Sequence, residues 1–348
     1  MSGAEREAAR RAFLAQAGWA DAALAPLDGD ASTRRYDRAR GLGGRRAILM
    51  DAGAEGGPVA CAFLALTGWL RAQGFSAPEI WAEAAGQGLL LIEDLGEALV
   101  ARIAAGDPGV EAETYAAAVD LLAALGRLAP PLALPAAEGC HAIPPYDQAV
   151  LLREARILAE WYLPLAAAAA PSPDLLAVYE GLVAEACASV AGAAGCLTLR
   201  DYHAENLVWL PGRAGLARIG LLDYQDALRG HPAYDLVSLL EDARRDTAAE
   251  LREAMIARFL AQAAIRPEPF GAAYATLGAQ RNLKIIGIFA RLWLRDGKPG
   301  YLRLIPRVWG HLMRDLAHPA LAGLCRFVTA HVPAPGPAIL ARIAGAGR

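Results

Sequence analysis

Two carboxylates and one amide have the types and spacing that phosphoryl transfer requires. Asp201 lies five residues before Asn206 in a segment between two short apolar runs, and Asp223 stands at the end of the next apolar hairpin. In such a set, one carboxylate orients and deprotonates the attacking hydroxyl, while the amide and the second carboxylate hold Mg²⁺ against the phosphates. The spacing predicts Asp201 as the catalytic base and Asn206 and Asp223 as the magnesium ligands.

A simpler interpretation makes Asp201 and Asp223 turn residues, because Asp and Asn side chains bond their own backbone in turns. The joint spacing favours the catalytic interpretation over this one. His203 and Glu205 lie in the same loop and could form a metal site with Asp201, although a lone loop histidine more often packs locally. We assign His203, Glu205 and Gln225 to the acceptor-binding region.

The elements that position these residues change in character near residue 95. Helical and alternating patterns before it predict a helix, three strands in an antiparallel meander, a second helix and two further strands, at residues 4–17, 24–28, 34–39, 45–51, 58–74, 79–84 and 88–93. Later residues have mostly helical spacing, apart from short strands at 197–199, 207–210 and 217–222. We therefore predict an α+β protein with a small sheet-containing lobe at 1–95 and a large, mainly helical lobe at 96–348.

The composition excludes several classes of protein. The 348 residues are 55% hydrophobic and 20% charged, which is typical of a globular chain. No apolar run approaches the length of a membrane helix, and the charges between Met1 and Arg11 do not fit a signal peptide, so we expect a cytoplasmic protein. Five widely spaced cysteines predict neither disulfides nor a zinc site. A net charge of −3 with scattered arginines gives no nucleic-acid-binding stripe, and no protein partner is implied.

Three segments together resemble the aminoglycoside phosphotransferase and choline kinase family, whose members are distant relatives of the protein kinases. They are the Asp201–Asn206 loop, the strand end at Asp223, and the sequence Gly-His-Pro-Ala-Tyr-Asp-Leu at 230–236. Within the family, these motifs and the segment 284–296 resemble the anomeric sugar kinases, which phosphorylate the 1-hydroxyl of N-acetylmuramate and N-acetylglucosamine in cell-wall recycling.

The resemblance implies a two-lobed, protein-kinase-like fold and an ATP- and Mg²⁺-dependent sugar 1-phosphotransferase. It places backbone groups of a hinge at 92–95, including Glu93 and Leu95, against adenine, and it gives Asp235 the task of bracing the catalytic loop. Two alternatives stay open. One is another small-molecule kinase of this fold, acting on an aminoglycoside, choline or an amino-acid hydroxyl; the other is a catalytically dead nucleotide-binding pseudokinase.

The sequence departs from the kinase pattern at the phosphate-binding lysine. Met50 stands where the third strand should carry that lysine, no lysine precedes Lys284, and the helix at 58–71 lacks the glutamate that would pair with it. Leu199 replaces the usual histidine before the catalytic aspartate. We therefore predict that the first hairpin binds the nucleotide phosphates, through Ser32, Thr33, Arg34 and Arg35. Adjacent strand residues point to opposite faces, so at most one of the two arginines enters the site, and a solvated strand face is the alternative for both.

A cationic helix face is the candidate for acceptor binding. Lys284, Arg291 and Arg295 are spaced by seven and four residues, which places them on one side of a helix. Such a face suits the carboxylate of a muramate-type acid and not a polycationic aminoglycoside, although a merely solvated face fits too. The sequence leaves open which N-acetyl sugar is preferred, whether GTP replaces ATP, and whether the chain dimerises.

Overall fold

The computed structural model describes residues 2–27, 34–136, 139–193 and 195–347. Contacts divide the chain into two compact units. Unit 1 comprises residues 1–121, 131–143 and 204–227, and unit 2 comprises residues 122–130, 144–203 and 228–348. Ser32 and Thr33 lie outside the described residues, so their predicted contact with phosphate stays a prediction.

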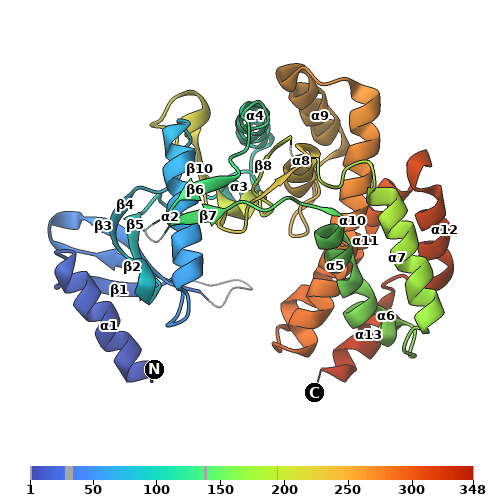
Figure 1. The fold of residues 1–348 in the computed structure, drawn as a ribbon, viewed down its shortest axis with the longest axis horizontal. Helices are drawn as coiled ribbons and strands as arrows, with labels where there is room; N and C mark the ends of the chain where they lie inside the picture. The colour runs from blue at the N-terminus through green and yellow to red at the C-terminus, as the bar shows by residue number, and fades with distance from the viewer. Residues whose placement is uncertain (1, 28–33, 137–138, 194, 348) are drawn as a thin grey trace. The chain divides into compact units, whose positions relative to one another are not determined.

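An antiparallel five-stranded sheet forms the centre of unit 1 (Figure 1). Its order is β1-β2-β3-β5-β4, which confirms the predicted meander of the first three strands. β5 reads Leu-Leu-Leu-Ile-Glu and lies between β3 and β4, as a continuous apolar run predicts. The strand bounds are β1 Ala23–Pro26, β2 Arg35–Arg40, β3 Arg46–Asp51, β4 Ile80–Ala84 and β5 Leu89–Glu93.

Helix α1 (Gly3–Gln16) covers one face of this sheet. A capping box starts it, because the Ser2 hydroxyl accepts from the Glu5 N–H while the Glu5 carboxylate accepts from the Ser2 N–H. Its apolar side chains pack on alternate strand residues, including Ala47 and Leu49 of β3. Side chains alternate along a strand, so Ile48 and Met50 belong to the opposite face of the sheet.

The remaining elements of unit 1 come from three stretches of the chain. They are α2 Gly57–Ala72, α3 Val100–Ile103, the first part of α4 Pro108–Leu125, β6 Ala133–Pro135, β7 Cys140–Ala142, β9 Leu207–Trp209 and β10 Ile219–Leu221. Bridges join Leu99 to Val208 and Ser76 to Gly220, and the Trp209 N–H donates to the Ala98 carbonyl at 2.8 Å. These backbone contacts tie residues 204–227 to unit 1, so the division does not coincide with a single boundary at residue 95.

Unit 2 is mainly helical, and α10 (Pro267–Leu294) runs through its middle against α5, α8 and α11 (Figure 1). A Cβ on Gly287 would lie 2.4 Å from the Ile157 carbonyl oxygen, so glycine permits this close helix crossing. A short antiparallel pair, β8 with β11, completes the unit. The other bounds are α5 Gln148–Ile157, α6 Leu163–Ala166, α7 Pro173–Cys187, β8 Cys196–Thr198, β11 Leu228–Gly230, α8 Ala233–Leu240, α9 Ala249–Ala263, α11 Ile305–Leu316, α12 Ala322–His331 and α13 Pro337–Ala346.

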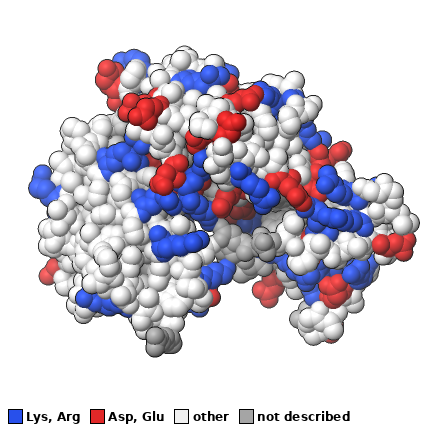
Figure 2. Space-filling view, turned by 180° about the vertical axis from the view of Figure 1, so that it is seen from behind, with Lys and Arg blue, Asp and Glu red and all other residues white. Residues whose placement is uncertain are grey.

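Acidic and basic side chains are interspersed among the described residues on the face that Figure 2 shows. All five cysteines are free thiols in this structure. Among the described residues, no helix combines the length and the apolar character needed to cross a bilayer.

Candidate active site

The β9–β10 hairpin of unit 1 brings the two predicted magnesium ligands to the same end of a short ladder. Leu207 pairs with Leu221, Asn206 directly precedes β9, and Leu222 and Asp223 directly follow β10. The Leu222 N–H donates to the Asn206 carbonyl at 3.0 Å, which extends the ladder by one step. The segment between the amide and the carboxylate is thus folded back on itself by antiparallel pairing.

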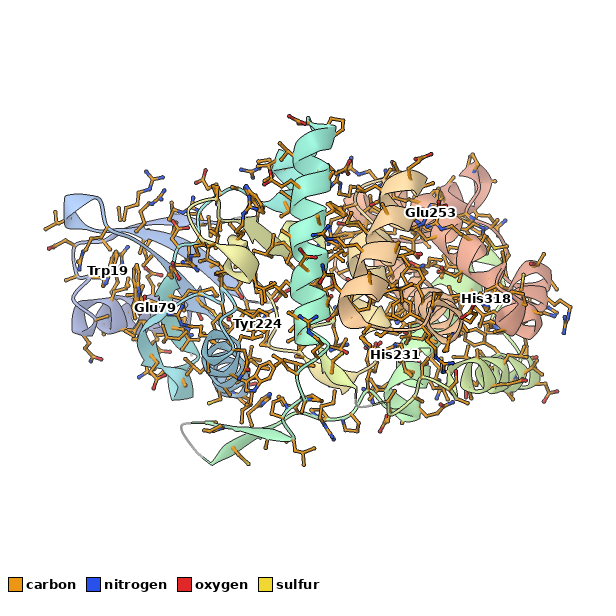
Figure 3. All side chains as sticks on the ribbon, turned by 90° about the horizontal axis from the view of Figure 1, so that it is seen from above. Trp19, Glu79, Tyr224, His231, Glu253 and His318 are labelled. Atoms are coloured by element: carbon orange, nitrogen blue, oxygen red, sulfur yellow. The ribbon has the colours of Figure 1, made fainter. Side chains whose placement is uncertain are left out.

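Asp223 has a left-handed backbone, with φ of 59°, and its carboxylate has two partners in unit 1. Arg34 Nη2 lies 2.6 Å from Asp223 Oδ1, and Gln225 Nε2 donates to the same oxygen at 3.1 Å. Gln225 also donates to Asp226 at 2.9 Å, so it joins the two carboxylates. The intervening Tyr224, which Figure 3 labels, stacks on Phe63 of α2 with ring centroids 5.1 Å apart. The turn that carries Asp223 is therefore anchored on a helix.

Asn206 and Asp223 supply the oxygen ligands that Mg²⁺ prefers, and that ion is usually held by one or two protein groups plus waters and nucleotide phosphates. Within the described ranges, no three or more His, Cys, Asp or Glu side chains gather as a metal-holding group. The donor set fits a hard cation completed by phosphate oxygens. It does not resemble a closed structural metal site.

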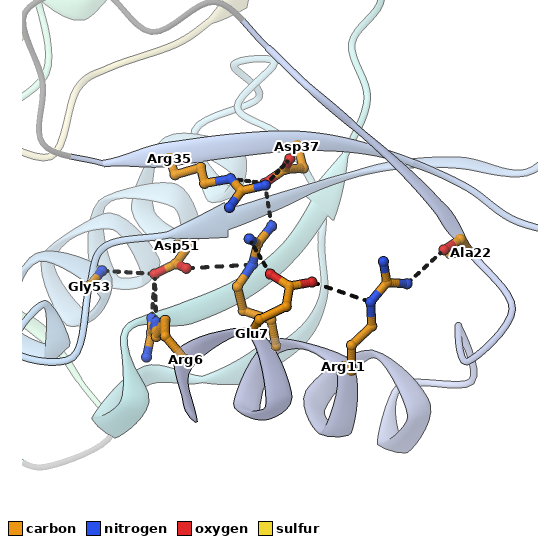
Figure 4. A network of polar contacts seen from close by, with 9 residues as sticks. Arg6, Glu7, Arg11, Ala22, Arg35, Asp37, Asp51 and Gly53 are labelled. Carbon is orange, nitrogen blue, oxygen red and sulfur yellow. Dashed lines mark hydrogen bonds and ion pairs between the residues drawn. The ribbon is translucent and has the colours of Figure 1, made fainter. Parts of the chain in front are cut away.

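The two candidate arginines, Arg34 and Arg35, have separate partners. Arg35 pairs with Asp37 on the face that α1 covers, where Arg6 and Arg10 of α1 also bind Asp51 and Asp37 (Figure 4). Arg34 pairs with Asp223 instead. Burial acts to lower the pKa of Arg34, but neighbouring Tyr36, Asp223 and Asp226 raise it above the ordinary value. Of the two arginines, Arg34 is the one in contact with a predicted magnesium ligand.

The kinase lysine position is filled by an apolar side chain. Met50 is fully buried in β3, and Tyr36 lies opposite it in the register of β2 and β3. Burial raises the pKa of Tyr36 to about 12, and its hydroxyl group interacts electrostatically with Arg34. Cross-strand partners share a face, so Met50 and Tyr36 lie on the face opposite α1. Arg34, two residues before Tyr36, brings a cation to this neighbourhood without the lysine.

The predicted adenine hinge follows β5. The Glu93 N–H donates to the Glu79 carbonyl at 2.8 Å, and the Glu93 carboxylate pairs with Arg213 at 2.5 Å. The side chain of Leu95 packs on Gly220 of β10. A Cβ added to Gly220 would lie 2.9 Å from Leu95 Cδ1. The Glu93 N–H already donates to another residue of the protein. The prediction that the hinge binds adenine therefore depends on backbone groups after Glu93.

Asp201 belongs to unit 2, in the loop that follows β8. The Asp235 carboxylate, on α8, accepts from the Leu199 N–H at 2.6 Å and from the Arg200 N–H at 2.8 Å. Burial raises the pKa of Asp235 to about 7, although these two bonds act in the opposite direction. Asp235 thus braces the residues directly before Asp201, in the manner that the family resemblance implies.

The other predicted acceptor residues are divided between the units. His203 is buried in unit 2, and burial lowers the pKa of its imidazole, whereas Glu205 lies in a helical turn of unit 1, at Ala204–Asn206. Lys284 of α10 pairs with Glu154 of α5, Nζ to Oε1 at 2.9 Å. Arg291, in the same helix, is partly buried. Binding of the acceptor by these residues and by Gln225 stays a prediction.

Arg295 departs from the predicted cationic face. It lies just beyond α10 and pairs with the adjacent Asp296 at 2.7 Å. Sequence reasoning also missed Glu154, because a buried glutamate in an amphipathic helix has no local feature that distinguishes it from a solvated one. Its partners, Arg200 and Lys284, lie far from it along the chain, in the loop that follows β8 and in α10.

The chain is similar in sequence to known proteins over most of its length. A family model described as "Phosphotransferase enzyme family" matches residues 23–270. The chain belongs to this phosphotransferase family. An N-acetylmuramate/N-acetylglucosamine kinase from Caulobacter vibrioides is 40% identical over 360 aligned residues, covering 94% of this chain and 97% of that protein. A protein of the same name from Pseudomonas aeruginosa is 33% identical, with 90% of each chain covered.

The fold also matches solved members of the wider group. A choline/ethanolamine kinase family protein from Mesorhizobium loti aligns with a TM-score of 0.56 at 14% identity, covering 99% of this chain and 100% of that one. The predicted fold class is confirmed: an α+β phosphotransferase with an N-terminal antiparallel sheet and a mainly helical remainder. The phosphotransferase family also confirms the enzyme class at its coarser level, transfer of a phosphoryl group.

Proposed function

We propose that this phosphotransferase is an ATP-dependent sugar kinase that phosphorylates the anomeric hydroxyl of N-acetylmuramate, N-acetylglucosamine or both. The observation that carries the proposal is the 40% identity, over 94% of the chain, to a protein named for those two sugars. The chain retains Asp201, Asn206 and Asp223 in the spacing that phosphoryl transfer needs. Together these features favour an active kinase over a pseudokinase.

In the proposed reaction, Asp201 accepts the proton of the acceptor hydroxyl as its oxygen attacks the γ-phosphorus. The bond between that phosphorus and the β–γ bridging oxygen breaks, which releases ADP. Asn206 and Asp223 would hold Mg²⁺, which when bound neutralises charge on the phosphates. Arg34 lies next to Asp223 and supplies the cation that the missing lysine does not. The Glu93 N–H is already bonded to the Glu79 carbonyl and is not available to adenine. In the proposed complex, the backbone groups of Leu95 bind adenine instead.

Anomeric transfer is the finer part of the proposal, and a panel of acceptors tests it. ADP release would be measured with ATP, Mg²⁺ and N-acetylmuramate, N-acetylglucosamine, kanamycin, choline or homoserine. We expect turnover with at least one N-acetyl sugar and none after its reduction to the alditol, which lacks an anomeric hydroxyl. Phosphorus NMR that places the phosphate on carbon 6 would refute anomeric transfer, and turnover only with a non-sugar acceptor would refute the substrate class.

Asp201→Asn is the matched inactive control. The amide keeps the size of the carboxylate but cannot take the proton, so we expect nucleotide binding to persist while kcat falls by about 10²–10⁴-fold. Turnover within a few-fold of the parent protein would show that Asp201 is a turn residue and not the base. A protein that binds nucleotide but turns over no acceptor would be a pseudokinase.

A further inference from the structure

A buried carboxylate in unit 2 ties helix α10 to the catalytic loop. Glu154 of α5 is 6% exposed and forms ion pairs with Arg200 and with Lys284. The Tyr146 hydroxyl donates to its other oxygen, Oε2. Burial acts to raise the pKa of Glu154, but the cations of Lys284 and Arg200 outweigh it and lower the pKa to about 2. Glu154 therefore stays ionised and links a helix cation to a loop cation.

The loop cation belongs to the residue directly before Asp201. Arg200 has a left-handed backbone, with φ of 73°, which a residue with a side chain adopts only where its surroundings hold it. Its N–H donates to Asp235, and its carbonyl accepts from the Ser238 hydroxyl at 3.3 Å. Its guanidinium pairs with Glu154. The backbone donor, the backbone acceptor and the side chain are thus each held by a different residue.

Helix α10 supports Arg200 along two routes. Arg281 Nη2 donates to the Ser238 hydroxyl at 2.8 Å, and Ser238 holds the Arg200 carbonyl. One turn further along the helix, Lys284 holds Glu154, which binds the Arg200 guanidinium. The Lys284 ammonium also lies 3.5 Å from the Tyr234 hydroxyl, and its side chain is 13% exposed. Both sets of contacts link α10 to Arg200, whose backbone directly precedes Asp201.

We propose that Lys284 is a positioning residue that acts through Glu154 and Arg200 to hold the catalytic loop at Asp201, and that it does not bind the acceptor carboxylate. The proposal deepens the sugar-kinase assignment and rests on it for its kinetic test. A lysine that recognises substrate must give its ammonium to an incoming anion. Here the ammonium is directed at a buried carboxylate that already has a second cation and a tyrosine hydroxyl as partners.

The two acceptor sugars separate positioning from substrate binding, because N-acetylmuramate carries a carboxylate and N-acetylglucosamine does not. For Lys284→Met, we expect kcat to fall at least tenfold with both sugars and KM for ATP to stay within about twofold. Lys284→Arg keeps the charge, and we expect it to recover kcat to within about threefold of the parent. A rise in KM for N-acetylmuramate alone, with N-acetylglucosamine kinetics unchanged, would overturn the proposal in favour of carboxylate binding.

Hydrogen exchange gives a readout that needs no acceptor. The amides of Leu199, Arg200 and Asp201 all donate hydrogen bonds in the structure. We expect a peptide spanning them to exchange faster in Lys284→Met and in Glu154→Gln than in the parent protein. Arg156→Met is the matched control, because Arg156 also lies in α5 and is ion-paired, to Glu180 at 3.0 Å, outside this network.

The two measurements distinguish the failure of each proposal. If the parent protein turns over neither sugar, the proposed substrate is wrong, while faster exchange in the two variants still supports the positioning of the loop. Exchange and kcat that are unchanged in Lys284→Met would overturn the positioning proposal whatever the substrate is. Equal acceleration in Arg156→Met would assign the effect to general loosening of α5 and would overturn it as well.

Discussion

Replacing Arg34 tests how this phosphotransferase works without the kinase lysine. Arg34 Nη2 lies 2.6 Å from Asp223 Oδ1, and the Arg34 side chain is 12% exposed, so solvent screens the pair only in part. Two unit charges centred about 4 Å apart interact by about 4 kcal/mol at an effective dielectric constant of 20. Arg34 beside a phosphate oxygen would act on the same energy scale, and magnesium and backbone amides would supply part of that charge stabilisation. We therefore expect Arg34→Ala to lose a fraction of it, about 1.4–2.8 kcal/mol, which is about a 10–100-fold fall in kcat/KM for ATP.

The assay compares kcat and KM for magnesium–ATP in Arg34→Ala, Arg34→Lys and Arg35→Ala, after thermal unfolding has shown that each variant is folded. Arg34→Lys should fall between the parent and the alanine variant, because it keeps the charge and loses the planar fork. Arg35→Ala should stay within about twofold, since that side chain is 54% exposed and pairs with Asp37 on the α1 face. Normal rates in Arg34→Ala, or equal losses at both arginines, would refute the reasoning.

Restoring the lysine should not compensate for the loss of Arg34. Met50 is fully buried between strands, and α2 contains no glutamate to pair with an ammonium there. An unpaired ammonium in such a place is costly. We expect Met50→Lys combined with Arg34→Ala to be no faster than Arg34→Ala alone and to unfold at a lower temperature. Recovery of the parent rate would show that this position can still carry the function of the kinase lysine.

Two further predictions concern the metal ligand and the pH dependence of stability. Asp223→Ala should weaken magnesium-dependent ATP binding at least about tenfold by calorimetry, because it removes the anionic ligand of a proposed Mg²⁺ site; unchanged affinity and rate would leave Asp223 a turn residue only. His231 Nδ1 accepts from the Ala233 N–H at 3.1 Å, and burial lowers the pKa of this histidine to about 4. The unfolded chain protonates this histidine near its ordinary pKa of about 6.5, whereas the folded protein protonates it only near pH 4. The free energy of unfolding is therefore unaffected above about pH 6.5 and falls by up to about 3 kcal/mol as the pH drops from there to about 4. His231→Asn keeps an acceptor without that titration, so in urea unfolding between pH 7 and pH 4 its stability should fall less than that of the parent; equal falls would contradict the assignment.

Local patterns were sufficient for much of the fold. The apolar run at 89–92 predicts a central strand, and β5 is central; Pro58 predicts a helix start, and α2 begins at Gly57. The pairing of β8 with β11 was not predicted, because three-residue strands separated by the whole β9–β10 hairpin carry no periodic signal. Strand type is a local property, whereas a pairing partner is not.

The candidate site shows the same limit. The segment between Asn206 and Asp223 forms the hairpin that joins them, so their placement at one end of it could be predicted from the sequence, while their role as magnesium ligands stays a prediction. The choice between Arg34 and Arg35 needed the register of β2 against β3 and the position of α1, neither of which two adjacent arginines reveal. Glu154 was out of reach, because its importance comes from ion pairs with residues on other elements.

Each of the two units is built from three separate stretches of the chain, so neither is encoded by a continuous segment of the gene. The backbone passes from one unit to the other between residues 121 and 122, 130 and 131, 143 and 144, 203 and 204, and 227 and 228. No single cut therefore releases either unit as a continuous segment, and recombination could not exchange one unit for a homologous one in a single event. The crossing at 203–204 falls between Asp201 and Asn206, so an insertion there would lengthen the link between the proposed base and a proposed metal ligand. Exchange of a whole unit would therefore need several coordinated recombination events, whereas a point substitution leaves every connection between the units intact.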